Sequence, residues 1–435
     1  MVTFLIRDFP DLDHLFPIIN VFLKKKEKVN ILNFEINLNL EDDPKIQYLS
    51  RNYEKNLNIC DVYNIKGNRF LIDDLIKFLS SQKFKKINFK NLKNLKINNN
   101  IFYFFYLLVI CYLKKIVFSS KSRIENYLFS EKWAQNIFIK TNIESLVLDD
   151  SYYFNFSRPQ SLIKVCKLNK IKIILMPHTC YMFTRKEDID NLKSKKIKNF
   201  YPKVIVTSEK MKQIFNSCGI EQTKIFNLGS ARFSSDHLNL LETIYQKNKN
   251  EEKKSSDNKK KKILYIDGSY DNNIDKISLI NKISKFKNIE LVVKAHPRGM
   301  FLKNQLSNKQ KKLTENNNSN FLIDVSTPTK KLIENSDLIL GTYSSILVEA
   351  MLVKKQIILP KFLIKDQIEF EIFYEKFGFA KICNNINEVV EYINSYDDNN
   401  LNQNLELISK FVRDYVYGGR ENSSSILREY YDLIK

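Results

Sequence analysis

The chain lacks the sequence motifs of the commonest nucleotide-binding and metal-binding sites. Its 435 residues contain no GxxxxGK(S/T) phosphate loop and no GxGxxG after an apolar segment. P-loop nucleotidases and ordinary dinucleotide enzymes need these glycines so that the backbone can approach a phosphate. The four histidines and six cysteines are scattered, without the spacing of metal ligands. We therefore expect neither a bound metal ion nor another cofactor.

Paired cysteines and an export signal are missing as well. The chain has no CxxC pair, and several cysteines fall in apolar segments, where cysteine behaves as a small hydrophobic residue. Arg7 and Asp8 interrupt the first apolar segment, unlike the pattern of a secretory signal. The apolar segment 101–113 has 13 residues, and a membrane-spanning helix needs about 20. These features predict a cytoplasmic protein and favour a buried helix at 101–113 over a membrane-docking segment.

The net charge of +21 has three interpretations, namely a nucleic-acid partner, an anionic membrane surface or anionic substrates. We find no zinc-finger spacing and no RNP-type aromatic signature, so we expect no nucleic-acid partner. Much of the excess is dispersed lysine, which ordinary solvated surfaces also carry. We expect the rest to attract anionic substrates and to support peripheral contact with the anionic inner face of a membrane.

Short apolar segments alternate with amphipathic helical segments in both halves of the chain, which is typical of a doubly wound parallel sheet. A charged stretch without apolar periodicity, 246–262, indicates a linker. We therefore predict an α/β fold with two Rossmann-like domains that face a cleft. The region 41–140 is predicted to be mostly helical. The predicted strands are 2–6, 29–34, 145–148, 171–176, 204–207, 224–228, 263–266, 289–293, 321–324, 338–340, 356–359 and 379–382.

A histidine and two serines follow predicted strands in the second half of the chain. His296 ends one strand, with Arg298 close behind it, and Ser344 and Ser345 follow another strand and open a helix. Since the carboxyl ends of parallel strands share one edge of a sheet, these side chains can converge on one anion. Arginine adds a permanent charge and a fork that suits phosphate. We predict that these four residues bind the phosphates of a nucleotide donor.

Neighbouring polar residues extend this predicted site. Glu349 lies one helical turn after the second serine and could accept the hydroxyl groups of a ribose, or it is a solvent-exposed helix glutamate. Thr342 belongs to the same loop. Asp267-Gly268-Ser269 closes the first strand of the second half, where a tight turn can direct N–H groups to a phosphate or an acceptor.

The first half places another histidine at a strand end. His178 follows the segment 171–176, and Asp149-Asp150 follows the preceding strand at the same predicted edge. Histidine suits the role of general base for an acceptor hydroxyl, and a nearby carboxylate could orient it. The alternative is a core or helix-capping histidine. Asp13 or His14 points at the same edge and is a further catalytic candidate, although Asp13 alternatively caps the helix that it precedes.

These motifs together resemble the GT-B superfamily of nucleotide-dependent transferases. Within it, the chain resembles bacterial capsule and surface-polysaccharide transferases and the CDP-glycerol glycerophosphotransferases that build teichoic acids. The resemblance covers the second half well and the first half loosely. The related histidine loop often reads His-Gly, whereas Thr179 follows His178 here. The resemblance rests on Lys294–Arg298, Gly341–Ser345 with Glu349, Pro177-His178-Thr179, Gly229-Ser230-Ala231-Arg232 and the tail 411–434.

The resemblance implies a domain plan. We expect a C-terminal helix that crosses back to the first domain, as is common in the GT-B fold. The expected boundaries are 1–240 for an acceptor-side domain, 241–262 for the linker, 263–410 for a nucleotide-donor domain and 411–435 for the closing helix.

The implied function is that of a metal-independent glycosyltransferase or polyol-phosphate transferase. It would use a CMP- or CDP-activated donor and a glycan or lipid-linked acceptor in the synthesis of capsule, lipopolysaccharide or a teichoic-acid-like polymer. Asp267-Gly268 is also similar to the acidic-glycine motif of bacterial sialyltransferases, in which the acid is the base, so Asp267 remains an alternative to His178. The alternative functions are a UDP-N-acetylglucosamine 2-epimerase-like isomerase and a non-catalytic basic protein that binds nucleic acid or membrane.

Overall fold

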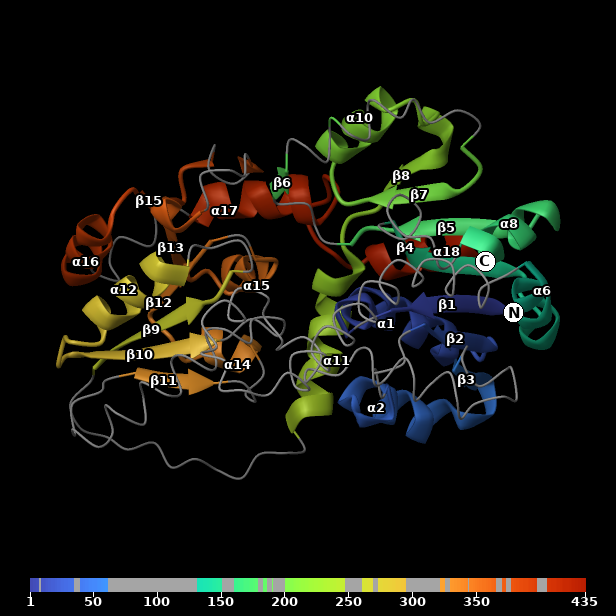
Figure 1. Cartoon of the computed structure of the whole chain (residues 1–435), viewed down its shortest axis with the longest axis horizontal. Helices are drawn as coiled ribbons and strands as arrows, with labels where there is room; N and C mark the ends of the chain where they lie inside the picture. Colours follow the sequence, from blue (N-terminus) through green and yellow to red (C-terminus); the bar gives the residue numbers. More distant parts are fainter. Residues whose placement is uncertain are drawn as a thin grey trace, which may run out of the picture. The chain divides into compact units, whose positions relative to one another are not determined.

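The computed structural model contains two compact units (Figure 1). Unit 1 is Met1–His178, Tyr201–Val204 and Tyr430–Lys435, and unit 2 is Thr179–Phe200 and Ile205–Glu429. The structure describes residues 1–7, 9–34, 40–61, 131–150, 160–178, 183–185, 190, 200–246, 260–268, 273–294, 321–324, 329–342, 344–364, 370–372, 377–396 and 405–435.

The first large sheet is parallel, with seven strands in the order β3-β2-β1-β4-β5-β7-β8. Its central strands β1, β4 and β5 are buried along most of their length, and each contains an apolar run of three or more residues, as strands covered on both faces do. The strands are β1 (Val2–Ile6), β2 (Val29–Asn33), β3 (Leu57–Asp61), β4 (Ser145–Asp149), β5 (Lys172–Met176), β7 (Lys203–Val206) and β8 (Ile225–Asn227). The described helices of this half of the chain are α1 (Phe9–Lys24), α2 (Pro44–Tyr53), α6 (Glu131–Thr141), α8 (Gln160–Leu168), α10 (Glu209–Ser217) and α11 (Ser235–Gln246).

The second large sheet is also parallel, with six strands in the order β11-β10-β9-β12-β13-β15. The strands are β9 (Lys261–Ile266), β10 (Ile289–Lys294), β11 (Phe321–Asp324), β12 (Leu338–Gly341), β13 (Gln356–Pro360) and β15 (Ala380–Cys383). The described helices are α12 (Asn273–Ile283), α14 (Thr329–Glu334), α15 (Ile346–Leu352), α16 (Ile386–Ser395), α17 (Leu405–Phe411) and α18 (Ile426–Ile434), with a π-helix at Val412–Val416. A separate antiparallel pair joins β6 (Phe183–Arg185) to β14 (Phe370–Ile372).

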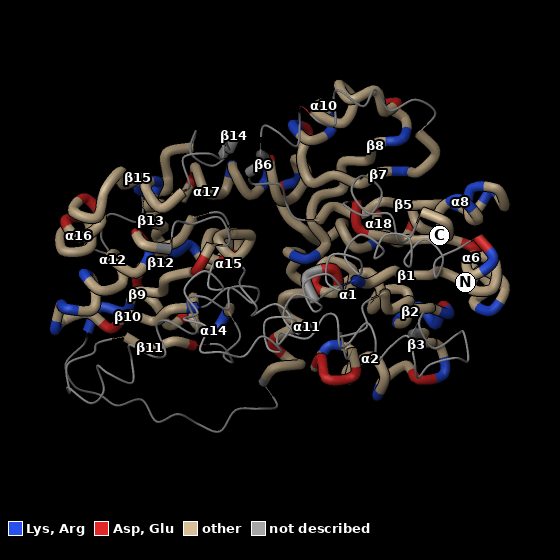
Figure 2. Tube along the Cα trace, in the orientation of Figure 1, with Lys and Arg blue, Asp and Glu red and all other residues tan. Residues whose placement is uncertain are grey.

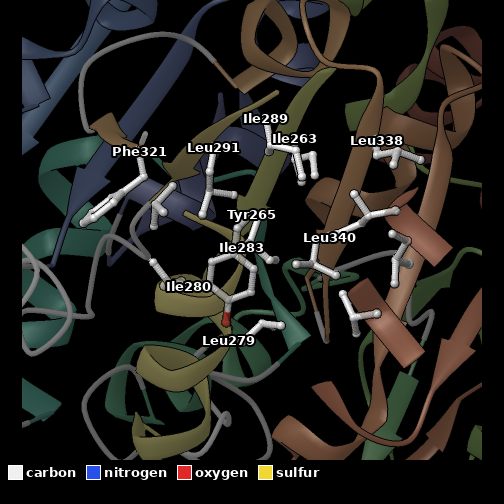
Figure 3. Packing of buried hydrophobic residues seen from close by; sticks show 14 of the residues in the cluster. Ile263, Tyr265, Leu279, Ile280, Ile283, Ile289, Leu291, Phe321, Leu338 and Leu340 are labelled. Atoms are coloured by element: carbon white, nitrogen blue, oxygen red, sulfur yellow. The ribbon is translucent and has the colours of Figure 1, made fainter. Parts of the chain in front are cut away.

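The core of the second sheet lies between its strands and the apolar face of α12 (Figure 3). Tyr265 of β9 is fully buried beside Leu291 and Leu340 of the neighbouring strands, and Leu279 and Ile283 cover them from α12. Burying one such side chain stabilises a fold by about 1.5–3 kcal/mol. This packing fixes the carboxyl ends of β9 and β12, where the candidate donor residues lie.

The chain returns to unit 1 at its C-terminus, residues Tyr430–Lys435. Within unit 1, the Ser145 hydroxyl donates to the carbonyl oxygen of Ile434 (3.4 Å). The Tyr431 ring packs on Phe22 with 4.8 Å between centroids, and its hydroxyl donates to Glu27 Oε1 (3.0 Å). The last turn of α18 is therefore part of the unit 1 core.

The described part of the region 41–140 is mostly helical but also contains the edge strand β3, which was not predicted. One local expectation is wrong. The helix after β1 begins at Phe9 rather than at Asp13, so Asp13 lies inside α1 and does not cap it. Pro10 in the first turn costs no hydrogen bond, because the first N–H groups of a helix have no partner within it. The segment 101–113 lies outside the described residues.

Candidate functional site

The first candidate site lies at the carboxyl edge of the seven-stranded sheet, within unit 1. β4 and β5 are neighbours, with Asp149 paired to Met176 at their ends. Two residues beyond β5, His178 places Nδ1 2.7 Å from Asp149 Oδ2. Asp149 is buried, whereas 32% of the His178 side chain is exposed. The predicted proximity of these two residues is confirmed, and the imidazole keeps access to solvent.

Further acids surround this pair. Asp11, in the first turn of α1, is fully buried and offers an oxygen within 4.8 Å of the ligand atoms of Asp149 and His178. The backbone N–H of Arg7 donates to Asp11 Oδ2 (2.9 Å), and the Arg7 guanidinium lies 3.6 Å from Asp11 Oδ1. Asp150 is also buried. Two carboxylates and an imidazole at this spacing could hold a divalent cation, which would have to displace the proton between His178 and Asp149.

The acids decide the charge of His178. Burial has the largest single effect and lowers the pKa of His178, since it penalises the charged form. The charge and hydrogen bond of Asp149, together with the charges of Asp150 and Asp11, outweigh burial and raise that pKa from 6.5 to about 9. At neutral pH His178 is therefore mostly an imidazolium. Loss of its Nε2 proton produces a strong base beside solvent.

Asp13 lies in a different ion pair. Its Oδ1 accepts from Lys45 Nζ at 2.6 Å, and this pair joins α1 to α2. Asp43 caps α2 by accepting from the backbone N–H of Lys45 (2.8 Å). The residue of this segment that approaches the first site is His14, whose ring centroid is 5.9 Å from that of His178. The geometry therefore favours His14 over Asp13 as a neighbour of the reacting group.

The second candidate site lies after β12, within unit 2. Thr342 is fully buried, and the Ser344 hydroxyl accepts from the backbone N–H of Ile346 (3.3 Å). Ser345 is the N-cap residue of α15 but makes no capping hydrogen bond with its side chain. Its hydroxyl instead accepts from Arg232 Nη1 at 3.4 Å. The second serine is therefore directed toward a cation rather than toward its own helix.

Arg232 also pairs with Glu349. Its Nη2 donates to Glu349 Oε1 at 3.2 Å, and the two side chains are only 15% and 16% exposed. Glu349 is therefore not the solvent-exposed glutamate that was the alternative. The sequence alone assigned no chemical role to Arg232, because the residues that it contacts are more than a hundred positions away. Its place in the Gly-Ser-Ala-Arg turn was the only available signal.

A close backbone approach fixes this turn. Gly229 has φ +76°, and a Cβ atom there would lie 2.8 Å from the backbone of Tyr417. The next N–H, that of Ser230, donates to the carbonyl oxygen of Val416 (2.7 Å). A larger residue at Gly229 would both strain φ and collide with the segment after the π-helix. This contact places Arg232 before any ligand arrives.

Asp267 directly follows β9 and forms a buried ion pair. Lys276 Nζ donates to Asp267 Oδ1 and also to the carbonyl oxygen of Gly268 (3.0 Å). The side chains of Asp267 and Lys276 are 2% and 5% exposed. On the neighbouring strand, Lys294 pairs in register with Asp324, and burial lowers the pKa of Lys294 while Asp324 opposes that effect. Cations thus accompany the acids of this sheet edge.

Some predicted residues cannot be placed in either site. His296, Arg298 and Ser269 lie outside the described residues, as does Thr179.

A family model matches most of the chain. The model is that of CDP-glycerol:poly(glycerophosphate) glycerophosphotransferase, and it covers residues 89–429. The chain belongs to this glycerophosphotransferase family. The matched residues include His178, Arg232, Ser345 and Glu349. No curated protein matches the chain.

Solved structures with the same fold resemble this family member over nearly its whole length. The UDP-GlcNAc 2-epimerase of Methanocaldococcus jannaschii is 15% identical, with a TM-score of 0.55 and 99% of each chain covered. The Neisseria meningitidis enzyme of that name, bound to UDP-GlcNAc, is 12% identical, with a TM-score of 0.53 and 98% of each chain covered. Anabaena HepE, in complex with UDP and glucose, is 10% identical, with a TM-score of 0.53 and coverage of 99% of this chain and 98% of that chain.

These similarities show the fold. The glycerophosphotransferase-family chain has the two parallel-sheet α/β domains of GT-B-type proteins, as its sequence motifs indicated. Within the part of the chain that the structure describes, no helix combines the length and the apolar character that crossing a bilayer requires.

Proposed function

We propose that this family member is a metal-independent transferase that moves a sugar or polyol phosphate from a CMP- or CDP-activated donor to an acceptor hydroxyl. The family match supports the transferase class and a cytidine donor, since CDP-glycerol is the donor in the family's description. The hydrogen bond between His178 and Asp149 carries the proposed chemistry. The acceptor is a growing glycan or lipid-linked oligosaccharide of capsule, lipopolysaccharide or a teichoic-acid-like polymer, and the enzyme works in the cytoplasm.

Unit 1 supplies the base in this proposal. Neutral His178 takes the proton of the acceptor hydroxyl on Nε2, while its Nδ1–H group stays bonded to Asp149. With CDP-glycerol as donor, the acceptor oxygen forms a bond to the β-phosphorus. The bond from that phosphorus to the bridging oxygen breaks, and CMP leaves with the electron pair. Asp149 stabilises the imidazolium that results, because the two charges are opposite and partly buried.

Unit 2 supplies the donor site. Ser344, Ser345 and Thr342 would bind the donor phosphates together with His296 and Arg298. Arg232 adds a cation already directed at Ser345, so it exchanges its bond with Glu349 for one with a donor phosphate. This exchange frees Glu349 Oε1 to accept a ribose hydroxyl.

His178 is a better candidate for the base than Asp267. The Asp267 carboxylate is almost wholly buried and is held by Lys276, so an acceptor hydroxyl would have to break an ion pair to reach it. His178, by contrast, is partly exposed and has its second ring nitrogen available. Asp267 and Gly268 then shape the turn at the end of β9 rather than transfer a proton.

A thermal-shift screen tests the donor assignment. A ligand that binds only the folded protein raises Tm, and we expect CMP or CDP to give larger shifts than UDP, GDP or ADP. Ser345→Ala reduces the cytidine shift, whereas Ser395→Ala, an exposed serine on α16, leaves it intact. Equal shifts with all five nucleotides would rule out a cytidine-specific site.

A turnover assay separates this function from its alternatives. CDP-glycerol with a hydroxyl-bearing polymer releases CMP if the proposal holds. Conversion of UDP-N-acetylglucosamine without any acceptor would instead identify an epimerase, the activity in the names of two structural neighbours. Absence of turnover, together with binding of nucleic acid or membrane that survives Ser345→Ala, would identify a non-catalytic binding protein.

A further inference from the structure

One edge of the unit 1 sheet carries a concentration of lysines. All strands of this sheet run parallel, so the connections that lead into β2, β4 and β5 meet at the amino edge. Among the residues that the structure describes, the exposed lysines at the ends of these connections and at the C-terminus, which we name the basic edge, are Lys24, Lys25, Lys26, Lys28, Lys140, Lys167, Lys170 and Lys435. Figure 2 shows blue segments on α6 and α8 beside the chain ends.

The few acids of the basic edge are mostly occupied by cations. Glu27 accepts from Lys435 and from Tyr431, which lowers the pKa of Glu27. Glu144 pairs with the amino group of Met1. Asp432 on α18 is the third acid nearby. The surface therefore keeps a strong positive excess.

Two further lysines begin strands at this edge. Lys172 starts β5 and Lys203 starts β7, and both are half-buried. Burial lowers the pKa of Lys172, and the charge of Lys203 lowers it further. The effect of Lys203 on Lys172 is electrostatic repulsion between lysines that begin adjacent strands, which is consistent with like charges lying close together at this edge.

Exposed aliphatic side chains lie among these lysines. Ile139 in the last turn of α6 is 72% exposed, and Leu168 at the end of α8 is 68% exposed. The two helices pack against each other, and both end at the amino edge. Nucleic acid would bind the lysines but would make no favourable contact with these two aliphatic side chains. A bilayer binds both, because acyl chains take up the aliphatic groups while anionic headgroups bind the lysines.

We infer that the basic edge docks on an anionic lipid bilayer, with Ile139 and Leu168 entering the interface between headgroups and acyl chains. This inference extends the proposed function by giving the enzyme a location. It does not depend on that function, because the surface lies at the opposite edge of the sheet from His178 and Asp149. A five-residue strand spans roughly 17 Å, so docking leaves the carboxyl edge free to react.

Vesicle flotation of the full chain, without donor or acceptor, tests the inference. We expect binding to vesicles of phosphatidylcholine with roughly one-third phosphatidylglycerol, whose negative surface potential attracts lysines, and none to pure phosphatidylcholine. Replacing Lys24, Lys28, Lys140 and Lys167 by glutamine should weaken binding by roughly 100- to 1,000-fold. The matched control replaces Lys285, Lys287, Lys381 and Lys410, which are exposed in unit 2, and should bind as the parent does.

The aliphatic contribution has its own readout. Leu168→Trp should be quenched by brominated acyl chains beyond the background from Trp133, which is buried. Ile139→Asn with Leu168→Asn should leave salt-sensitive attraction but remove the binding that persists in high salt. His178→Ala should bind vesicles normally while losing turnover, which separates this inference from the proposed function.

Three results would overturn the inference. Equal binding to neutral and anionic vesicles would show that the lysines do not bind headgroups. Equal losses of vesicle binding in the basic-edge variant and in the unit 2 control variant would show that binding depends on total charge rather than on the basic edge. Binding to polyuridylate that is tighter than binding to anionic vesicles, and that is lost in the basic-edge variant, would assign the surface to nucleic acid.

Discussion

The carboxyl edges of the two sheets carry acids and cations in different proportions. In unit 1, Asp149, Asp150 and Asp11 all raise the pKa of one partly exposed imidazole, and the Arg7 guanidinium lies 3.6 Å from Asp11. In unit 2, Asp267 and Glu349 each have a basic partner, Lys276 and Arg232. A site rich in acids holds and exchanges a proton, whereas a site whose acids are matched by cations can accept an additional anion. The contrast supports a base in unit 1 and a donor site in unit 2.

Removing the imidazole of His178 is the strongest test of the assignment of the base to unit 1 and the donor site to unit 2. His178→Ala should lower the transfer rate by roughly 10²–10⁴-fold, the usual contribution of general base catalysis. The Tm shift produced by a cytidine nucleotide should be unchanged, since the proposed donor site is in unit 2. A rate that survives in His178→Ala would exclude this histidine as the base and restore Asp267.

The Asp267–Lys276 pair should prove to be structural. Asp267→Leu alone leaves Lys276 with a buried, unmatched charge and should cost about 3–5 kcal/mol of unfolding free energy. The double variant Asp267→Leu with Lys276→Met should recover much of this loss, as measured by urea denaturation. If the double variant is stable but has no turnover, Asp267 has a chemical role after all.

Arg232 should matter for donor affinity rather than for the chemical step. Arg232→Ala should raise KM for the donor by roughly 10- to 100-fold, the value of a charge-assisted hydrogen bond, with a smaller change in kcat. Arg232→Lys should recover part of the affinity, because it restores the charge but not the fork. Arg428→Ala, which removes an exposed arginine of α18, is the matched control. A kcat effect without a KM effect would assign Arg232 to leaving-group stabilisation.

The pH dependence of the transfer rate tests the protonation state of His178 in unit 1. Because the pKa of His178 is about 9, about one molecule in a hundred has a neutral imidazole at pH 7. The rate should rise about tenfold per pH unit and level off near pH 9. Asp149→Asn removes a stabilising charge, so the rise should move to lower pH even though the maximal rate falls. A pH–rate profile that is unchanged in Asp149→Asn would mean that the titrating group is not His178.

The same titration affects stability in a defined direction. The pKa of His178 is raised by folding, so its stabilising contribution is complete below about pH 6.5 and is lost as pH rises through about 9. We expect a decrease of roughly 1–2 kcal/mol over this window, allowing for screening at the exposed part of the ring. Urea midpoints of the parent and of His178→Gln, compared at pH 6 and pH 9.5, measure it.

Chelation should have the smallest effect. We expect EDTA to leave turnover within about twofold, because the proton between His178 and Asp149 occupies the position that a cation would need. Loss of activity with EDTA and recovery with a divalent ion would show instead that Asp11, Asp149 and His178 form a metal site.

Sequence patterns were sufficient for the architecture. The strands 2–6 and 321–324 were predicted with their observed bounds, and most others within one or two residues. Buried parallel strands produce apolar segments that are visible without any tertiary information. The edge strand β3 and the short antiparallel strands β6 and β14 were not predicted, and the start of α1 was placed too late because Pro10 suits a first helical turn as well as a loop.

The sequence by itself determined which side chains follow parallel strands, and therefore that Asp149 and His178 would meet at one edge. Only the tertiary structure decided their charges and their remaining partners. Arg232 reaches Glu349 because the backbone of Gly229 fits against Tyr417, and the basic edge forms because separate connections converge. Periodicity records local burial along the chain, whereas ion pairs and pKa shifts depend on distances between residues that are far apart in sequence.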